Sequence, residues 1–118
     1  MIVIYLLTYT NLIKLADFVF LIQRQPKLEQ IVASINQSAD KGSQIIKFLP
    51  ELKKLGIQNA SFIDDQTLSF TIDCFIDNGS GIAFSKNSTQ PTNENLDCGG
   101  HLTRWDKLKN NWFAWSGN

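Results

Sequence analysis

Two cysteines and the single histidine are the residues of this sequence whose types and spacing could do chemistry. A disulfide between Cys74 and Cys98 would close a loop of 25 residues (74–98) and stabilise the fold by about 3.5 kcal/mol on the chain-entropy estimate. Cys98 and His101 also form a C-x-x-H half-site, to which Cys74 could add a third metal ligand. Two free buried thiols are the remaining alternative. We expect the disulfide, because the polar loop between the cysteines has almost nothing apolar to hold it.

The state of the cysteines also bears on localisation. A bridged pair favours a secreted, periplasmic or cell-surface protein, whereas two free thiols would favour the cytoplasm. His101 is the first candidate for acid–base work, but its neighbours Asp97, Cys98 and Asp106 belong to no known nucleophile motif. The sequence therefore predicts a protein that is not an enzyme and needs no cofactor.

Three tryptophans crowd the last fourteen residues: Trp105, Trp112 and Trp115. Exposed tryptophans at this density suit stacking on a sugar or anchoring a partner protein. Large aromatic side chains in small domains also fill cores, so a core role is the alternative. These three residues are the candidate ligand-binding site of a glycan-binding module.

The first 22 residues are dominated by apolar side chains, and their length approaches that of a membrane span. Thr10, Asn11, Lys14 and Asp17 interrupt the run as one polar stripe, and two charges near a bilayer centre are costly unless they pair. The helix must therefore be covered by its own core, by an interface with other subunits, or by a membrane surface. The candidate interaction residues are Ile2, Ile4, Leu7, Phe18, Phe20 and Ile22.

A second helical pattern follows Pro26, which ends or kinks the first helix. Helical spacing predicts a helix over 27–48 and a short helix over 50–55 that starts at Pro50.

From residue 57 the pattern alternates with period two, which predicts strands near 58–63, 67–76 and 80–86 in an antiparallel meander. Asn78-Gly79 is a strong hairpin-turn signal, and 87–97 is an exposed loop. Spacing of three suggests a helical turn at Leu102–Leu108, and Trp112–Trp115 reads as a short edge strand.

These elements predict one α+β domain over 1–118: an apolar helix (1–25), an amphipathic helical segment (27–55), and an antiparallel sheet with tethered loop and aromatic tail (57–118). The long helical segment, kinked near Pro26, would pack on three to four strands. Eleven basic side chains balance eleven acidic ones, which argues against a nucleic-acid partner. Residues 1–59 nevertheless carry a net charge of +3, and residues 64–97 carry −5.

An apolar helix running into an amphipathic one, then a meander and a cysteine-bounded loop, resembles the layout of type IV pilins and their pseudopilin relatives. Tyr5 stands where that family usually has a glutamate. The resemblance implies a structural or surface protein that self-associates or binds a protein partner. Our leading hypothesis is such a non-catalytic assembly domain, which uses the helix over 1–22. A glycan- or small-ligand-binding module is the alternative, and a cytosolic immunity or inhibitor protein that docks its acidic 64–97 region on a basic partner is the third.

Overall fold

Two helices precede five strands in the described part of the chain, and together they form an α+β fold. The computed structural model describes residues 2–76, 78–91, 98 and 101–118, with side chains described from Leu12 onward. The elements are α1 (Ile2–Gln37), α2 (Lys41–Lys54), β1 (Asn59–Asp64), β2 (Thr67–Phe75), β3 (Asn78–Ser85), β4 (Leu102–Lys109) and β5 (Trp112–Gly117).

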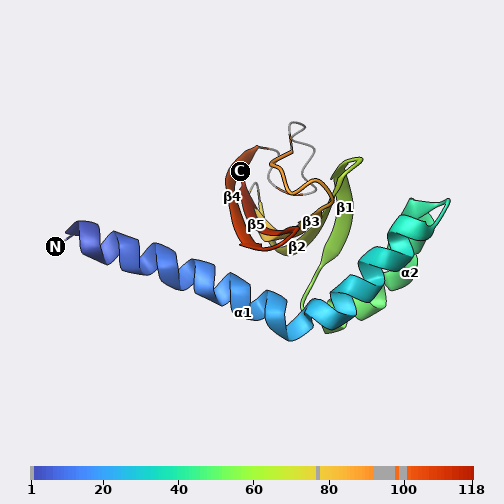
Figure 1. Ribbon diagram of the computed structural model, residues 1–118, viewed down its shortest axis with the longest axis horizontal. Helices are drawn as coiled ribbons and strands as arrows, with labels where there is room; N and C mark the ends of the chain where they lie inside the picture. The colour runs from blue at the N-terminus through green and yellow to red at the C-terminus, as the bar shows by residue number, and fades with distance from the viewer. Residues whose placement is uncertain (1, 77, 92–97, 99–100) are drawn as a thin grey trace.

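The helices divide differently from the prediction. α1 runs unbroken through Pro26 and bends there instead of giving way to a new helix (Figure 1). It ends at Gln37, so the helix predicted over 27–48 is wrong in its extent. Pro50 likewise lies inside α2 and does not start a separate short helix. The break falls at Asp40, whose carboxylate caps α2 by accepting a hydrogen bond from the Ser43 amide at 3.2 Å.

The five strands form one antiparallel sheet in the order β1-β2-β3-β5-β4. The first three strands confirm the predicted meander, but the strand count is five instead of three or four. β4 occupies the segment expected to form a helical turn, and the tryptophan-rich tail is the interior strand β5 instead of an edge strand. Asn110-Asn111 provides the turn between them, because Asn111 adopts a φ of 67° that asparagine tolerates.

The turn between β2 and β3 lies two residues earlier than Asn78-Gly79. β2 ends at Phe75 and β3 already begins at Asn78, which pairs with Phe75. Gly79 instead lets the backbone of Cys98 approach β3 closely, since a Cβ atom at position 79 would lie 2.6 Å from the backbone oxygen of Cys98. Ile76 instead takes a φ of 55° in the turn, a conformation that β-branched residues rarely adopt.

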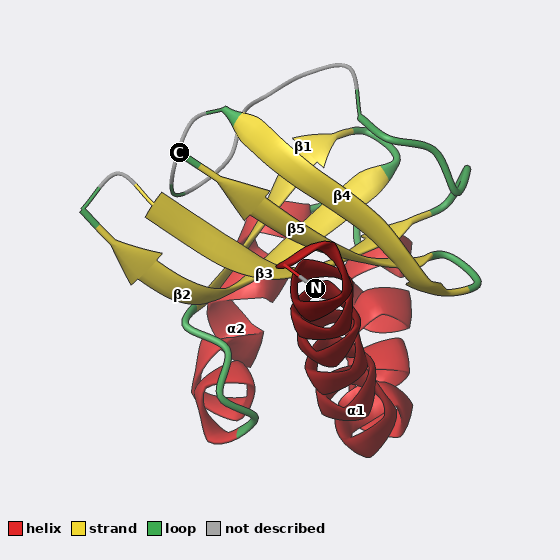
Figure 2. Cartoon of the chain, turned by 90° about the vertical axis from the view of Figure 1, so that its left-hand side faces the viewer, coloured by secondary structure: helices red, strands yellow, loops and turns green. Residues whose placement is uncertain are grey.

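The helices form one layer and the sheet the other (Figure 2). Between them lies the main core, to which α1 contributes Leu21, Leu28, Ile31 and Ile35, all fully buried. Leu52 of α2 and the sheet residues Leu68, Phe70, Ile82 and Trp112 complete the centre of this core. The N-terminal half of α1 projects beyond the sheet and makes the molecule 53 Å long (Figure 1).

Candidate functional site

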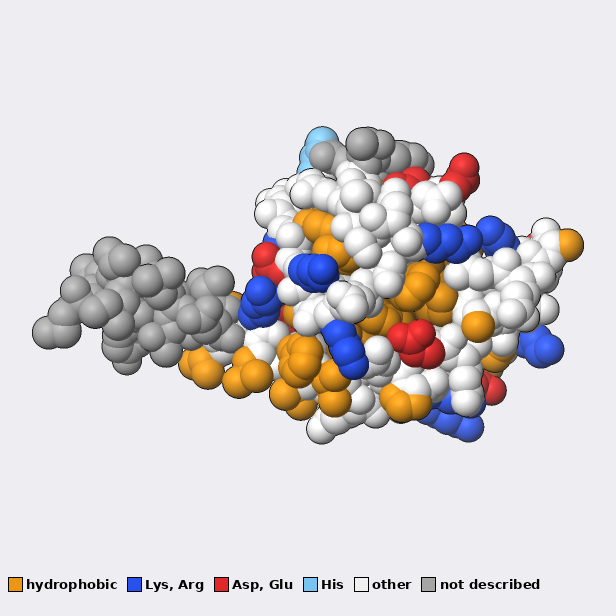
Figure 3. Space-filling model, viewed as in Figure 1, with side chains coloured by type: hydrophobic (Ala, Val, Ile, Leu, Met, Phe, Trp, Pro, Cys, Tyr) orange, Lys and Arg blue, Asp and Glu red, His pale blue; other side chains and the backbone are white. Residues whose placement is uncertain are grey.

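The side chains of α1 change environment along the helix. From Leu21 onward its apolar side is buried in the core, whereas between residues 12 and 22 six large apolar side chains remain 37–57% exposed. These six residues, here called the apolar band, are Leu12, Ile13, Leu15, Phe18, Val19 and Ile22. In Figure 3 orange side chains gather along this part of the molecule.

The apolar band is comparable in area to the largest apolar patch on a typical monomer. Six side chains of this type, each about half exposed, present roughly 500 Å² of apolar surface, near the upper end for a typical monomer. Leu12, Leu15 and Val19 also border a shallow groove of about 460 Å³, which ends at Gln23 and Arg24. Exposed patches of this size mark interaction sites more often than scattered exposed leucines do.

One of the two charges on this half of α1 is neutralised within the chain. Asp17 accepts a hydrogen bond from the Arg104 guanidinium of β4 at 2.8 Å, and Asp106 accepts another at 2.6 Å. Partial burial alone would lower the pKa of Arg104, but its hydrogen bonds to Asp106 and Asp17 and their negative charges outweigh burial and raise that pKa. The pair also links α1 to the sheet, because Asp17 lies on α1 and Arg104 on β4, 87 positions later in the sequence.

Arg24 makes a second tie where α1 bends. Its Nε donates to the carbonyl oxygen of Leu55 at 2.6 Å, and its guanidinium carbon lies 3.8 Å from the centre of the Phe20 ring. Together with the Asp17–Arg104 pair, this contact fixes the direction in which the projecting half of α1 leaves the domain.

The predicted interaction residues fall into three groups. Phe18 and Ile22 belong to the exposed apolar band, whereas Phe20 is partly buried against the core. The side chains of Ile2, Ile4 and Leu7 lie outside the described part of the structure. The sequence reasoning did not select Leu12, Leu15 and Val19 as interaction residues. Their spacing with Ile22, of three, four and three residues, places all four on one side of a helix and was the available signal.

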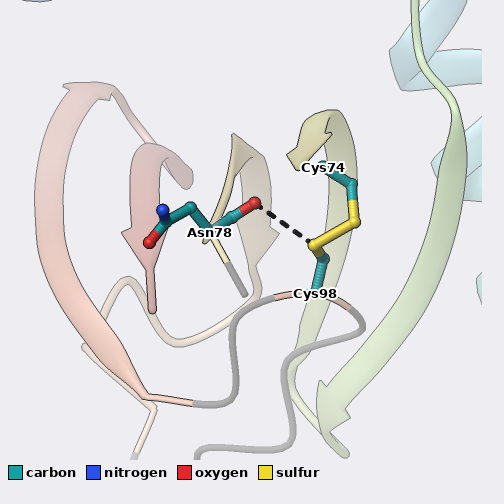
Figure 4. Close-up of a disulfide and its surroundings, with 3 residues drawn as sticks. All are labelled: Cys74, Asn78 and Cys98. Atoms are coloured by element: carbon teal, nitrogen blue, oxygen red, sulfur yellow. Dashed lines mark hydrogen bonds between the residues drawn. A yellow bond between two sulfur atoms is a disulfide. The ribbon is translucent and has the colours of Figure 1, made fainter. Parts of the chain in front are cut away.

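Cys74 and Cys98 form a disulfide, as predicted (Figure 4). It joins the end of β2 to the segment before β4, and the Cys98 Sγ lies 3.4 Å from the carbonyl oxygen of Asn78. In this disulfide neither sulfur is available as a thiolate ligand for the alternative metal site at Cys74, Cys98 and His101. The described residues contain no cluster of three acidic, histidine or cysteine side chains suited to a metal ion. His101 extends the β4–β5 pairing through two backbone hydrogen bonds with Asn118.

The three tryptophans do not form an exposed platform. Trp112 and Trp115 are fully buried, and their indole nitrogens donate to Glu29 of α1 at 3.0 Å and to the Ile82 carbonyl at 3.1 Å. Trp105 alone is half-buried, and its ring stacks on Phe113 with centroids 4.7 Å apart. Two of the three tryptophans predicted as a ligand-binding site are therefore in the core, and Trp105 is the only one of them with an exposed part.

Comparison with protein-family models, curated proteins and solved structures finds no match for this chain. The likeness to type IV pilins consequently rests on the order of elements alone. Among the described residues, no helix has both the length and the apolar character needed to span a membrane.

Proposed function

We propose that this chain is a non-catalytic assembly subunit, in which the projecting half of α1 packs against other copies of the same chain. The observation that carries the proposal is the apolar band on a helix that extends beyond its own sheet. Residues 1–23 carry two charged side chains, Lys14 and Asp17, and the second already has a partner in Arg104. Asp17 therefore adds little electrostatic cost to burial of this half of the helix, and Lys14 is the charge that still needs a partner.

The size of the surface supports an interface that extends past the apolar band. A stable protein–protein interface buries about 800 Å² on each partner, which is more than the band's roughly 500 Å². The sequence before Leu12 is mostly apolar as well and would supply the remaining area if the interface continued toward the N-terminus. The disulfide supports assembly in an oxidising compartment, such as the periplasm or the cell surface.

The test is the solution mass of the full chain and of one triple variant. We expect the full chain to be oligomeric by light scattering at micromolar concentration without detergent. The variant Leu12→Gln/Leu15→Gln/Val19→Gln should be monomeric, since glutamine keeps helix propensity but removes apolar area. Ile46→Gln is the matched control, because Ile46 is 68% exposed on α2, away from the band, and its loss should leave the mass unchanged.

A monomeric full chain under these conditions would contradict the proposal. If that monomer floated with lipid vesicles, a membrane surface would take the place of the second copy. An unchanged mass for the triple variant would equally contradict a role for the apolar band.

A second candidate function, binding of a small neutral ligand, is favoured by one observation on the opposite face of the sheet. Thr67, Ser69 and Thr71 alternate along β2, and Ser61 pairs with Ser69 across β1. The four hydroxyl groups and the indole nitrogen of Trp105 are buried, and none has a hydrogen-bond partner in the described structure. A neutral polyhydroxylated ligand that reached this face could pair with these groups.

Tryptophan fluorescence titrated with glucose, galactose and N-acetylglucosamine tests this candidate. Binding should quench or shift the emission, and Thr71→Val, which removes one hydroxyl at nearly constant volume, should weaken the response. No response to any sugar would count against the candidate and leave the assembly proposal unaffected.

A further inference from the structure

The turn between β2 and β3 exposes two large apolar side chains. Phe75 is 74% exposed and Ile76 is 80% exposed, the highest values among the large hydrophobic side chains that the structure describes. Ile76 also holds the left-handed φ of 55° that asparagine or glycine would adopt more easily. Backbone strain together with exposed apolar area is typical of a contact site.

Two adjoining hollows lie beside this turn. The first, of about 560 Å³, has one wall formed by Ile13 and Asp17 of α1 and another by Ile72 of β2. The second, of about 520 Å³, reaches Phe75. Both are lined by Asp73, Ser80 and Ser116, so they form one continuous surface, here called the acceptor groove.

The acceptor groove is acidic. Asp17 and Asp73 line it, and Arg104, the one cation among its described lining residues, is already bonded to Asp17 and Asp106. Asp73 is exposed and has no ion-pair partner within the described residues. A partner that brings an isolated positive charge on an apolar surface would complement this groove.

The projecting half of α1 is such a surface. Lys14 is the one cationic side chain among residues 1–23, is exposed, and has no ion-pair partner in the described part of the chain. It lies one helical turn before Phe18 of the apolar band, and so on the same side of the helix as that exposed ring. Burying α1 in an assembly would leave the Lys14 ammonium unpaired unless a carboxylate of the neighbouring copy met it.

The spacing of the two surfaces also agrees. Phe18 follows Lys14 by one helical turn, a rise of about 6 Å. Phe75 follows Asp73 by two strand residues on the same side, about 6.7 Å. A helix running along β2 with Lys14 at Asp73 would therefore bring Phe18 level with Phe75.

We propose that the acceptor groove receives α1 of a second copy of this chain, with Lys14 of one copy paired to Asp73 of the other. This inference rests on the proposed assembly function and specifies its partner surface. The two surfaces differ, so the contact is heterologous, and successive copies add to an open chain or a ring instead of stopping at a dimer.

The experiment is charge reversal followed by sedimentation velocity in low-salt buffer. Lys14→Glu and Asp73→Lys should each weaken association about tenfold or more, because each places like charges together. The double variant, and an equimolar mixture of the two single variants, should both recover association. Lys47→Glu on α2 and Asp65→Lys at the β1–β2 turn are matched controls at exposed positions and should change nothing.

A double variant that associates no better than the single variants would overturn this pairing, as would single variants that behave like the controls. These outcomes concern only the Lys14–Asp73 pairing. Failure of the assembly function itself would appear in the mass of the full chain and of the triple glutamine variant. Ile76→Asn supplies an independent check, because asparagine suits the left-handed φ. It should keep or raise the melting temperature while weakening association, and unchanged association would exclude the turn from the contact.

Discussion

Removing the Cys74–Cys98 disulfide should lower the free energy of unfolding by about 3.5 kcal/mol. The bridge spans a sequence separation of 24 residues, and the chain-entropy estimate for a loop of this length gives that value. A domain of this size has a total stability of about 5–15 kcal/mol, so the reduced protein should still fold. The sheet and the helical core do not depend on the bridge, since Cys74 lies near the end of β2 beyond the buried strand centre.

The measurement is urea unfolding of oxidised protein, of protein reduced with dithiothreitol, and of the variant Cys74→Ala/Cys98→Ala. Emission of the buried Trp112 and Trp115 reports loss of the core. With a urea dependence of about 1.5 kcal/mol per molar, the midpoint should fall by roughly 2 M. A mild detergent should be present throughout, because association through α1 would add its own stabilisation.

Two controls sharpen the result. Dithiothreitol should not shift the midpoint of the alanine variant, and denatured unreduced wild-type protein should titrate no free thiols. A midpoint shift below about 0.5 M on reduction, equivalent to less than ~1 kcal/mol, would refute the reasoning that the bridge constrains the unfolded chain.

Three further changes test the contacts that hold the fold. In urea unfolding, Gly79→Ala should destabilise the protein by about 2 kcal/mol, because the added Cβ would meet the backbone of Cys98. The control Gly42→Ala should be neutral or slightly stabilising, because the nearest neighbour of a Cβ atom there lies 3.7 Å away. Trp112→Phe should lower the free energy of unfolding by about 2 kcal/mol, because the core loses side-chain volume and the hydrogen bond to Glu29. Trp105→Phe changes a half-buried position and should lower it by less in the same assay. Asp17→Asn should lower the free energy of unfolding by about 1 kcal/mol, because it breaks the ion pair with Arg104, in which both side chains are about one-quarter exposed. Lys14→Gln should leave the stability of the monomer unchanged.

The local patterns of the sequence predicted the parts of the fold that depend on neighbouring residues. Alternation of Leu68, Phe70 and Ile72 located β2, and the loop's lack of apolar residues pointed to the disulfide. These signals act over a few residues, where strand and loop geometry follow directly from side-chain type.

The parts that were not predicted depend on contacts between distant residues. Leu102, Trp105 and Leu108 have a spacing that suits a helix, yet they lie on β4 because Asn110-Asn111 allows a tight return to β5. Asn78-Gly79 has the composition of a turn, but the approach of Cys98 occupies the space where a Gly79 side chain would lie. The partner of Asp17 is 87 residues away, so no helical spacing could have identified Arg104.

The sequence could not decide whether the first 22 residues lie in a core or at an interface, because that too depends on contacts with distant residues. A helix that is apolar over most of its circumference suits a core or an interface equally, because both environments exclude water. The structure separates the two along a single helix: the side chains of Leu21, Leu28 and Ile31 are in the core, whereas those of Leu12 and Leu15 are more than half exposed. The Asp17–Arg104 pair marks the boundary, since it satisfies the last charge before the helix leaves the sheet. Lys14, one turn further out, has no such partner among the described residues, and its need for a carboxylate is the strongest reason to look for one on another copy.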